Sequence, residues 1–67
     1  MFTMKAARIN VGLSIAEVAK ALGISEATLY NYEQGKTSPT IALALAMAKL
    51  YGRSIGEIDF PMSTSSE

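Results

Sequence analysis

The fold is decided by residues 14–35, which read SIAEVAKALGISEATLYNYEQG. Ser14 and Glu17 have the spacing of a capping box, in which each side chain accepts a hydrogen bond from the other residue's backbone N–H. Gly23 interrupts the stretch and supplies the positive φ that ends a helix. Ser25 is placed to cap a second helix directly afterwards. The stretch therefore predicts two short helices joined by a tight glycine turn.

Helices that pack across such a turn make three demands on the sequence. The first helix needs a small residue where the second helix crosses it, and Ala19 stands there. The turn needs positive φ, which Gly23 adopts without steric cost. An apolar side chain has to fill the space between the helices, and Leu29 has the required spacing. These three structural residues together indicate a helix-turn-helix unit.

Three further segments carry helix start and stop signals. Each begins after a Thr or Ser that can act as an N-cap and ends before a Gly or Pro. The start and stop residues are Thr3 and Gly12, Thr40 and Gly52, and Ser54 and Pro61. No run of four or more residues alternates apolar and polar in the manner of a half-buried strand. The sequence therefore predicts an all-α fold of five helices in one domain, residues 1–60, with a flexible tail at residues 61–67.

The composition excludes several functional classes. A chain of 67 residues forms one small domain, which buries only about 60% of the surface exposed by its unfolded form. It contains no cysteine and no histidine, which excludes disulfide bonds, thiolate metal sites and a Ser-His hydrolase. Its carboxylates are scattered and form no evident acid/base pair. We expect no enzymatic activity, no small-molecule substrate, no metal and no cofactor.

The sequence also lacks membrane signals. The first eight residues contain no apolar stretch of the kind found in a signal peptide. The longest wholly apolar run, residues 41–48, is far shorter than the roughly 20 residues that span a bilayer. We therefore expect a cytoplasmic protein with no membrane partner.

The charges are distributed unevenly, although the net charge of the chain is zero. Residues 1–53 hold all six Lys and Arg against three Glu, which makes this part +3, and residues 54–67 contribute the compensating −3. Zero net charge argues against a nucleic-acid partner, because proteins that bind phosphates are usually basic. The positive charge of residues 1–53 weakens that objection.

Four strings carry a resemblance to a known family. They are AARINVGLS at residues 6–14, EVAKALGIS at 17–25, YEQGKTSP at 32–39 and AKLYG at 48–52. Together they resemble the phage Cro and repressor family of helix-turn-helix regulators, also called the XRE family, over residues 4–60. The resemblance implies a compact, lambda-repressor-like five-helix domain. Its third helix would lie in the major groove, and a homodimer would read a double-stranded DNA operator.

The resemblance assigns base-reading positions to three residues of the third helix. Asn31 can bond N6 and N7 of adenine, Ala27 offers a methyl group to thymine, and Glu26 can accept from N4 of cytosine. Glu26 also stabilises the helix dipole from the first turn, and we favour this structural role over base reading for Glu26. Residues expected to flank the bases or to face phosphate are Thr28, Tyr30, Gln34, Lys36, Thr37 and Ser38.

Two other positions matter to the comparison with the family. Ile15 stands where the family usually has a glutamine that bonds a phosphate oxygen, so only backbone N–H groups remain for this contact. Arg8 and Glu33 correspond to a charged pair that joins the first helix to the end of the third. The resemblance therefore implies a structural ion pair, with two solvated surface charges as the alternative.

The fourth predicted helix is apolar on two sides. At about 100° per residue, one side holds Ile41, Leu45, Ala48 and Gly52, and we interpret this side as the core face. Leu43, Met47 and Leu50 share nearly the opposite side. This second side is covered by the segment with Ile58 and Phe60, by a second molecule, or by nothing. We favour a second molecule. The predicted dimer interface consists of Leu43, Met47, Leu50, Phe60 and Met62.

Two functions remain open at the level of sequence. The first is a sequence-specific DNA-binding transcriptional regulator of the Cro and repressor type. The second is a protein-binding module, such as an antirepressor or an antitoxin-like partner, with weak affinity for DNA. Zero net charge and Ile15 favour the second, whereas the polar face of the third helix and Lys36 favour the first.

Overall fold

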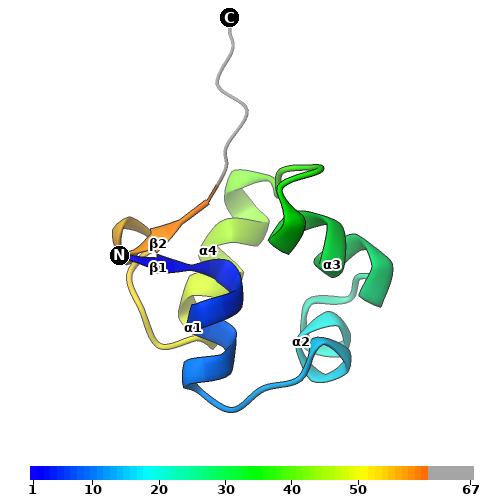
Figure 1. Cartoon of the computed structure of the whole chain (residues 1–67), viewed down its shortest axis with the longest axis horizontal. Helices are drawn as coiled ribbons and strands as arrows, with labels where there is room; N and C mark the ends of the chain where they lie inside the picture. Colours follow the sequence, from blue (N-terminus) through cyan, green and yellow to red (C-terminus); the bar gives the residue numbers. More distant parts are fainter. Residues whose placement is uncertain (61–67) are drawn as a thin grey trace, which may run out of the picture.

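The computed structural model describes residues 1–60 and contains mostly helix (Figure 1). The α-helices are α1 (Met4–Asn10), α2 (Ile15–Leu22), α3 (Glu26–Gln34) and α4 (Ile41–Leu50). A 3-10 helix, η1 (Ile55–Glu57), and two strands, β1 (Phe2–Thr3) and β2 (Ile58–Asp59), complete the described part. The tail predicted at residues 61–67, including the predicted interface residue Met62, lies outside the described residues.

Each α-helix begins at the N-cap that the sequence predicts. In all four, the hydroxyl of the cap accepts from the backbone N–H three residues later. The caps are Thr3, Ser14, Ser25 and Thr40, with distances of 3.0, 3.1, 3.0 and 3.1 Å. The Glu17 carboxylate completes the predicted capping box by accepting from the Ser14 N–H at 2.8 Å, which lowers the pKa of Glu17 below its usual value.

The prediction of a fifth α-helix is wrong. Ser54 and Glu57 do pair, with the Ser54 N–H donating to the Glu57 carboxylate at 2.8 Å, but the helix is a single 3-10 turn. Gly56 lies in the middle of this turn, and glycine is among the weakest helix formers. The chain then becomes extended. The capping signal therefore starts a turn that the following residues do not extend into an α-helix.

A short parallel β-pair replaces the end of the predicted fifth helix, so the all-α prediction is also incomplete. Phe2 pairs with Ile58 and Thr3 with Asp59, which places the start of the chain beside residues 58–59 (Figure 1). The Arg53 guanidinium carbon lies 4.2 Å from the Phe2 ring centroid, a cation–π contact that adds to this closure. Two-residue strands cannot display the alternation by which sequence analysis recognises a strand.

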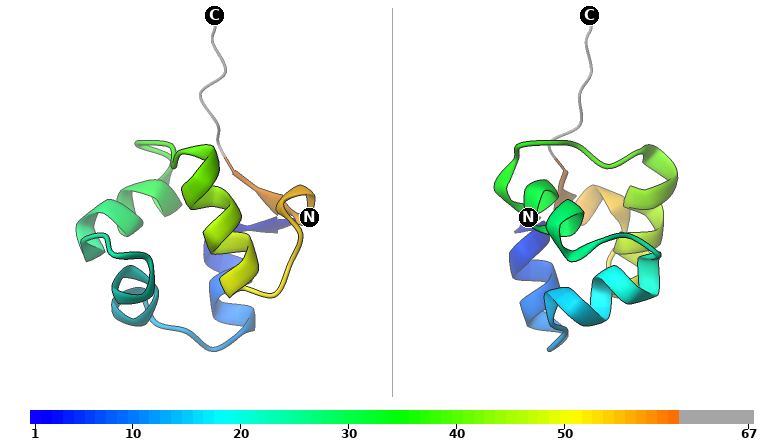
Figure 2. Two further views of the ribbon diagram at one scale, coloured as in Figure 1. Left: turned by 180° about the vertical axis from the view of Figure 1, so that it is seen from behind. Right: turned by 90° about the vertical axis from the view of Figure 1, so that its right-hand side faces the viewer.

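The core lies between the helices, and β2 contributes Ile58 to it. In the view from behind, α4 crosses in front of α1, while α2 and α3 form the other side of the molecule (Figure 2). All four α-helices and β2 contribute buried side chains. The core residues are Met4, Ala7, Val18, Ala19, Leu29, Met47, Ala48, Tyr51 and Ile58. No helix within residues 1–60 is long and apolar enough to cross a membrane.

The predicted orientation of α4 is wrong except at Ala48, which is buried in the core as we expected. Met47 is 0% exposed and lies in the core, while Leu43 and Leu50 are partly buried against it, as is Phe60 after β2. Ile41 and Leu45, which we expected to face the core, are 59% and 51% exposed. Because α4 is apolar almost all round, its periodicity does not identify the buried side. The core of the domain therefore includes Met47, with Leu43, Leu50 and Phe60 packed against it.

The corrected orientation of α4 predicts a large difference between two substitutions. Met47→Ala removes a fully buried side chain and should lower the free energy of unfolding by about 2–5 kcal/mol. Leu45→Ala removes a mostly exposed side chain and should change it by less than about 0.5 kcal/mol. Urea denaturation measures both changes in the free energy of unfolding, at a protein concentration that keeps the chain monomeric. A larger loss for Leu45→Ala would show that Leu45, and not Met47, faces the core.

Candidate nucleic-acid interface

The turn between α2 and α3 has the geometry of a helix-turn-helix unit. Gly23 adopts φ 71° in the left-handed region, and the Ile24 N–H donates to the Ala19 carbonyl at 3.0 Å. Ala19 of α2 is 3% exposed, Leu29 of α3 is fully buried, and both belong to the core. Gly23 therefore has the predicted left-handed conformation, and Ala19 and Leu29 are buried, as their proposed packing roles require.

Arg8 and Glu33 form the expected ion pair. Arg8 donates from Nε to Glu33 Oε2 at 2.7 Å and from Nη2 to Glu33 Oε1 at 3.1 Å, a two-pronged contact that fixes both side chains. A third guanidinium hydrogen bond, from Nη1, reaches the Leu13 carbonyl at 3.0 Å. The side chains of Arg8 and Glu33 are 10% and 2% exposed, so the alternative of two solvated charges is wrong. The pair fixes the last turn of α3 against α1.

Tyr51 packs in the core and interacts electrostatically with this pair. Burial raises the pKa of the Tyr51 hydroxyl to about 12, and the negative charge of Glu33 acts in the same direction. The hydroxyl is buried with no hydrogen-bond partner among the described residues. Tyr51 is therefore neutral at any physiological pH, and the charges at this position are those of Arg8 and Glu33.

The outward face of α3 carries most of the predicted DNA-contacting residues. Glu26, Ala27, Tyr30 and Gln34 are exposed. Asn31 is half-buried, because it lies toward the edge of this face. The face is uncharged except for Glu26, so it offers hydrogen-bonding and apolar groups but no cation.

The first turn of α3 is held by a pair of hydroxyl groups. Ser25 Oγ accepts from the Thr28 N–H at 3.0 Å and lies 2.8 Å from Thr28 Oγ1. The Thr28 side chain is therefore oriented by its own helix cap. Thr28 is half-buried, whereas Glu26 and Ala27 in the same turn are exposed.

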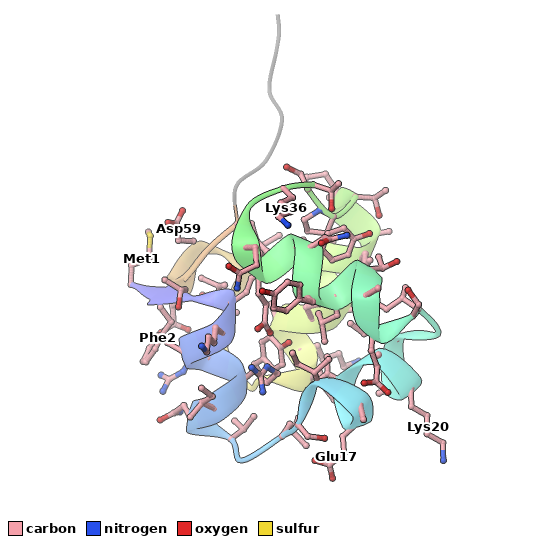
Figure 3. All side chains as sticks on the ribbon, turned by 45° about the vertical axis from the view of Figure 1, so that its right-hand side comes forward. Met1, Phe2, Glu17, Lys20, Lys36 and Asp59 are labelled. Atoms are coloured by element: carbon pink, nitrogen blue, oxygen red, sulfur yellow. The ribbon has the colours of Figure 1, made fainter. Side chains whose placement is uncertain are left out.

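The loop after α3 provides the only predicted cation of the interface. Gly35 adopts φ 77°, and the Lys36 N–H donates to the Asn31 carbonyl at 3.0 Å, which ends the helix sharply. Lys36 and Thr37 are exposed, Ser38 is half-buried, and Pro39 is buried. Figure 3 shows Lys36 at this loop, with Glu17 and Lys20 of α2 at the other end of the molecule.

The N-terminus of α2 differs from the family pattern in the way the sequence suggests. Ile15 is half-buried and packs against the core, so its side chain is not available to a phosphate. The Ser14 N–H donates to the Glu17 carboxylate and is therefore not free to bind a phosphate. A backbone contact here would use the remaining N–H groups of the first turn, which have no acceptor within the helix.

Other kinds of site are not found in residues 1–60. No pocket is present in this part of the chain. No three acidic, Cys or His side chains come together there in a way that could hold a metal ion.

The Arg8–Glu33 pair should behave as one energetic unit. Arg8→Met or Glu33→Met alone leaves a largely buried charge without its partner, and should lower the free energy of unfolding by about 2–4 kcal/mol. The double variant should lose less than either single variant, because no unpaired charge remains. Chemical denaturation of the three variants measures this, with exposed Lys49→Met as the control. Strictly additive losses would contradict the coupling.

Comparison with known proteins places the chain in a family. A family model described as helix-turn-helix matches residues 4–58. The chain is 38% identical over 52 residues to a protein of Sulfurisphaera tokodaii that is named as an HTH-type transcriptional regulatory protein. This match covers 78% of the present chain and 18% of that protein. A protein of Saccharolobus solfataricus with the same kind of name is 35% identical over 54 residues, covering 81% of this chain and 17% of that protein.

The chain spans less than a fifth of the length of these curated relatives. No solved structure matched it. The family match extends over nearly all of the described residues, and it coincides with the helix-turn-helix geometry at Gly23. The chain therefore belongs to the Cro- and repressor-like (XRE) family of helix-turn-helix DNA-binding regulators.

Proposed function

We propose that this chain is a sequence-specific DNA-binding transcriptional regulator that inserts α3 into the major groove. The observation that carries the proposal is the exposed face of α3, which is held at its start by the Gly23 turn and at its end by the Arg8–Glu33 pair. A helix fixed at both ends can present its side chains to base edges in a defined orientation. The regulator acts by occupying its operator and performs no chemistry.

Three residues of α3 are proposed to read bases. Asn31 bonds adenine, Ala27 contacts a thymine methyl group, and Glu26 accepts from cytosine. Glu26 also opposes the phosphates that line the groove, so it excludes sequences that offer no donor at its position. The exposure of Glu26 and Ala27 supports these roles.

The phosphate contacts are proposed to come from the end of α3 and the following loop. Lys36 supplies the charge, Gln34 an amide, and Thr37 and Ser38 their backbone, while Thr28 and Tyr30 flank the bases. A single cation gives a weak electrostatic contribution per monomer. Affinity therefore depends on two copies binding together.

We propose that the second copy docks on the exposed face of α4. Ile41 and Leu45 lie one turn apart on this face, with the small exposed residues Ala42 and Ala46 beside them. Small side chains allow two helices to approach closely. The face begins directly after the loop assigned to phosphate, so two copies joined here would lie side by side on DNA. This surface replaces the one predicted from sequence.

A second candidate function has specific support. A protein-binding module with weak DNA affinity would fit three features: the zero net charge, the packing of Ile15 against the core and the acidic Glu26.

Selection of bound duplexes from a random pool at low salt separates the two functions. A regulator enriches one sequence, whereas the protein-binding module enriches none.

The proposed DNA contacts should give two different signatures. Lys36→Ala should weaken binding to all duplexes alike and lower the salt slope by about 0.9 for each phosphate that a monomer no longer neutralises. Asn31→Ala should cost about 1–3 kcal/mol per half-site on the selected duplex and remove the preference at one base position. Fluorescence titrations over a range of salt concentrations measure both effects. If both variants bind like wild type, α3 is not the DNA-contacting helix.

The dimer proposal predicts a matched pair of variants. Leu45→Glu places a charge in the proposed interface and should yield a monomer, whereas Ile9→Glu changes a similarly exposed side chain on α1 and should leave the dimer intact. Sedimentation at high micromolar concentration measures the association state. A wild-type chain that is monomeric under these conditions would contradict dimerisation in the absence of DNA.

A further inference from the structure

Tyr30 is an exposed aromatic residue near the middle of the outward face of α3. Its side chain is 48% exposed. Glu26 lies one turn before it and Gln34 one turn after it, and both are exposed. Since residues four apart share a helix face, these three residues form one continuous ridge.

The fold gives no reason for an aromatic residue at this position. The inward side of α3 is filled by Leu29, which is fully buried, and by Tyr32, which packs against the core. An exposed ring contributes little to the stability of its own domain. Tyrosine is, however, enriched at binding hot spots, because it buries a large area at a small cost in side-chain entropy.

Ala27 extends the apolar part of this ridge. It precedes Tyr30 by three residues and is exposed, so the two Cβ atoms lie about 5–6 Å apart. Polar residues stand on both sides, Glu26 toward the start of the helix and Gln34 toward its end. The outward face of α3 therefore has an apolar centre between polar ends.

We propose that Tyr30 is a specificity-determining residue that, together with Ala27, recognises the C5-methyl groups of thymines in the major groove. This inference rests on the proposed function. Thymine is the only standard base that presents a methyl group there, and apolar side chains recognise it by contact. Successive bases on one strand are about 3.4 Å apart, so an apolar pair of this spacing spans neighbouring base pairs.

Uracil substitution tests the proposal, because it removes only the methyl group. Each thymine of the duplex selected by the wild-type chain is replaced singly by uracil, and affinity is measured for wild type, Tyr30→Ala and Tyr30→Phe. At one position, uracil should weaken wild-type binding by about 3- to 10-fold, the effect of one buried methyl group. Tyr30→Ala should be insensitive to that replacement, and Tyr30→Phe should respond like wild type.

Three outcomes would overturn the proposal. In the first, uracil has no effect on wild-type binding at any position. In the second, Tyr30→Ala loses the same affinity on thymine and uracil duplexes. In the third, Tyr30→Phe behaves like Tyr30→Ala, a result that would assign the role of Tyr30 to a bond between its hydroxyl and a phosphate. Because Tyr30 is exposed, the thermal midpoints of both variants should match wild type, and Ile9→Ala serves as the control for binding. Failure of the wild-type chain to select any duplex would refute the proposed function itself, before the uracil series begins.

Discussion

The bidentate bond between Arg8 and Glu33 is the constraint on which the rest of the structure depends. It joins α1 to the last turn of α3, and the third hydrogen bond of the guanidinium, to Leu13, fixes the connection into α2. One side chain thus links α1 with the end of α3 and with the segment that leads into α2. A largely buried charge pair stabilises a fold only weakly compared with apolar packing, but it tolerates little displacement. Its main contribution here is to the orientation of α3.

A chain with so small a core needs further interactions that hold its helix ends and its chain ends in place. Local hydrogen bonds stabilise the helix ends, and long-range contacts join the chain ends. Each α-helix is closed at its start by a hydroxyl that satisfies a free backbone N–H. The two ends of the described chain are joined by β1 and β2 and by the Arg53–Phe2 contact. Ile58, held by this pairing, is buried in the core. The β-pair therefore takes the place of the packing that a fifth α-helix would provide.

Sequence predicts the features that depend on neighbouring residues and fails where distant packing decides. The N-caps, the Gly23 turn and the environments of Ala19 and Leu29 follow from spacing alone. The buried side of α4 does not, because Met47 and Leu45 are both apolar and only the surrounding helices distinguish them. The strands are too short to give a pattern. Arg8 and Glu33 are 25 residues apart, and the family resemblance alone related them.

In the proposed function, the charge distribution makes binding depend on contacts to bases more than on attraction to phosphates. Glu26 stabilises the N-terminus of α3 through the helix dipole, yet the same charge opposes the DNA backbone. The only predicted cation of the interface, Lys36, lies beyond the other end of the helix. Between these charges the helix presents Ala27, Tyr30, Asn31 and Gln34, which are neutral groups that gain energy only against a matching surface. Such an interface would gain little binding free energy on non-specific DNA. Its discrimination between sequences would therefore be greater, and its affinity for DNA of any sequence would be lower.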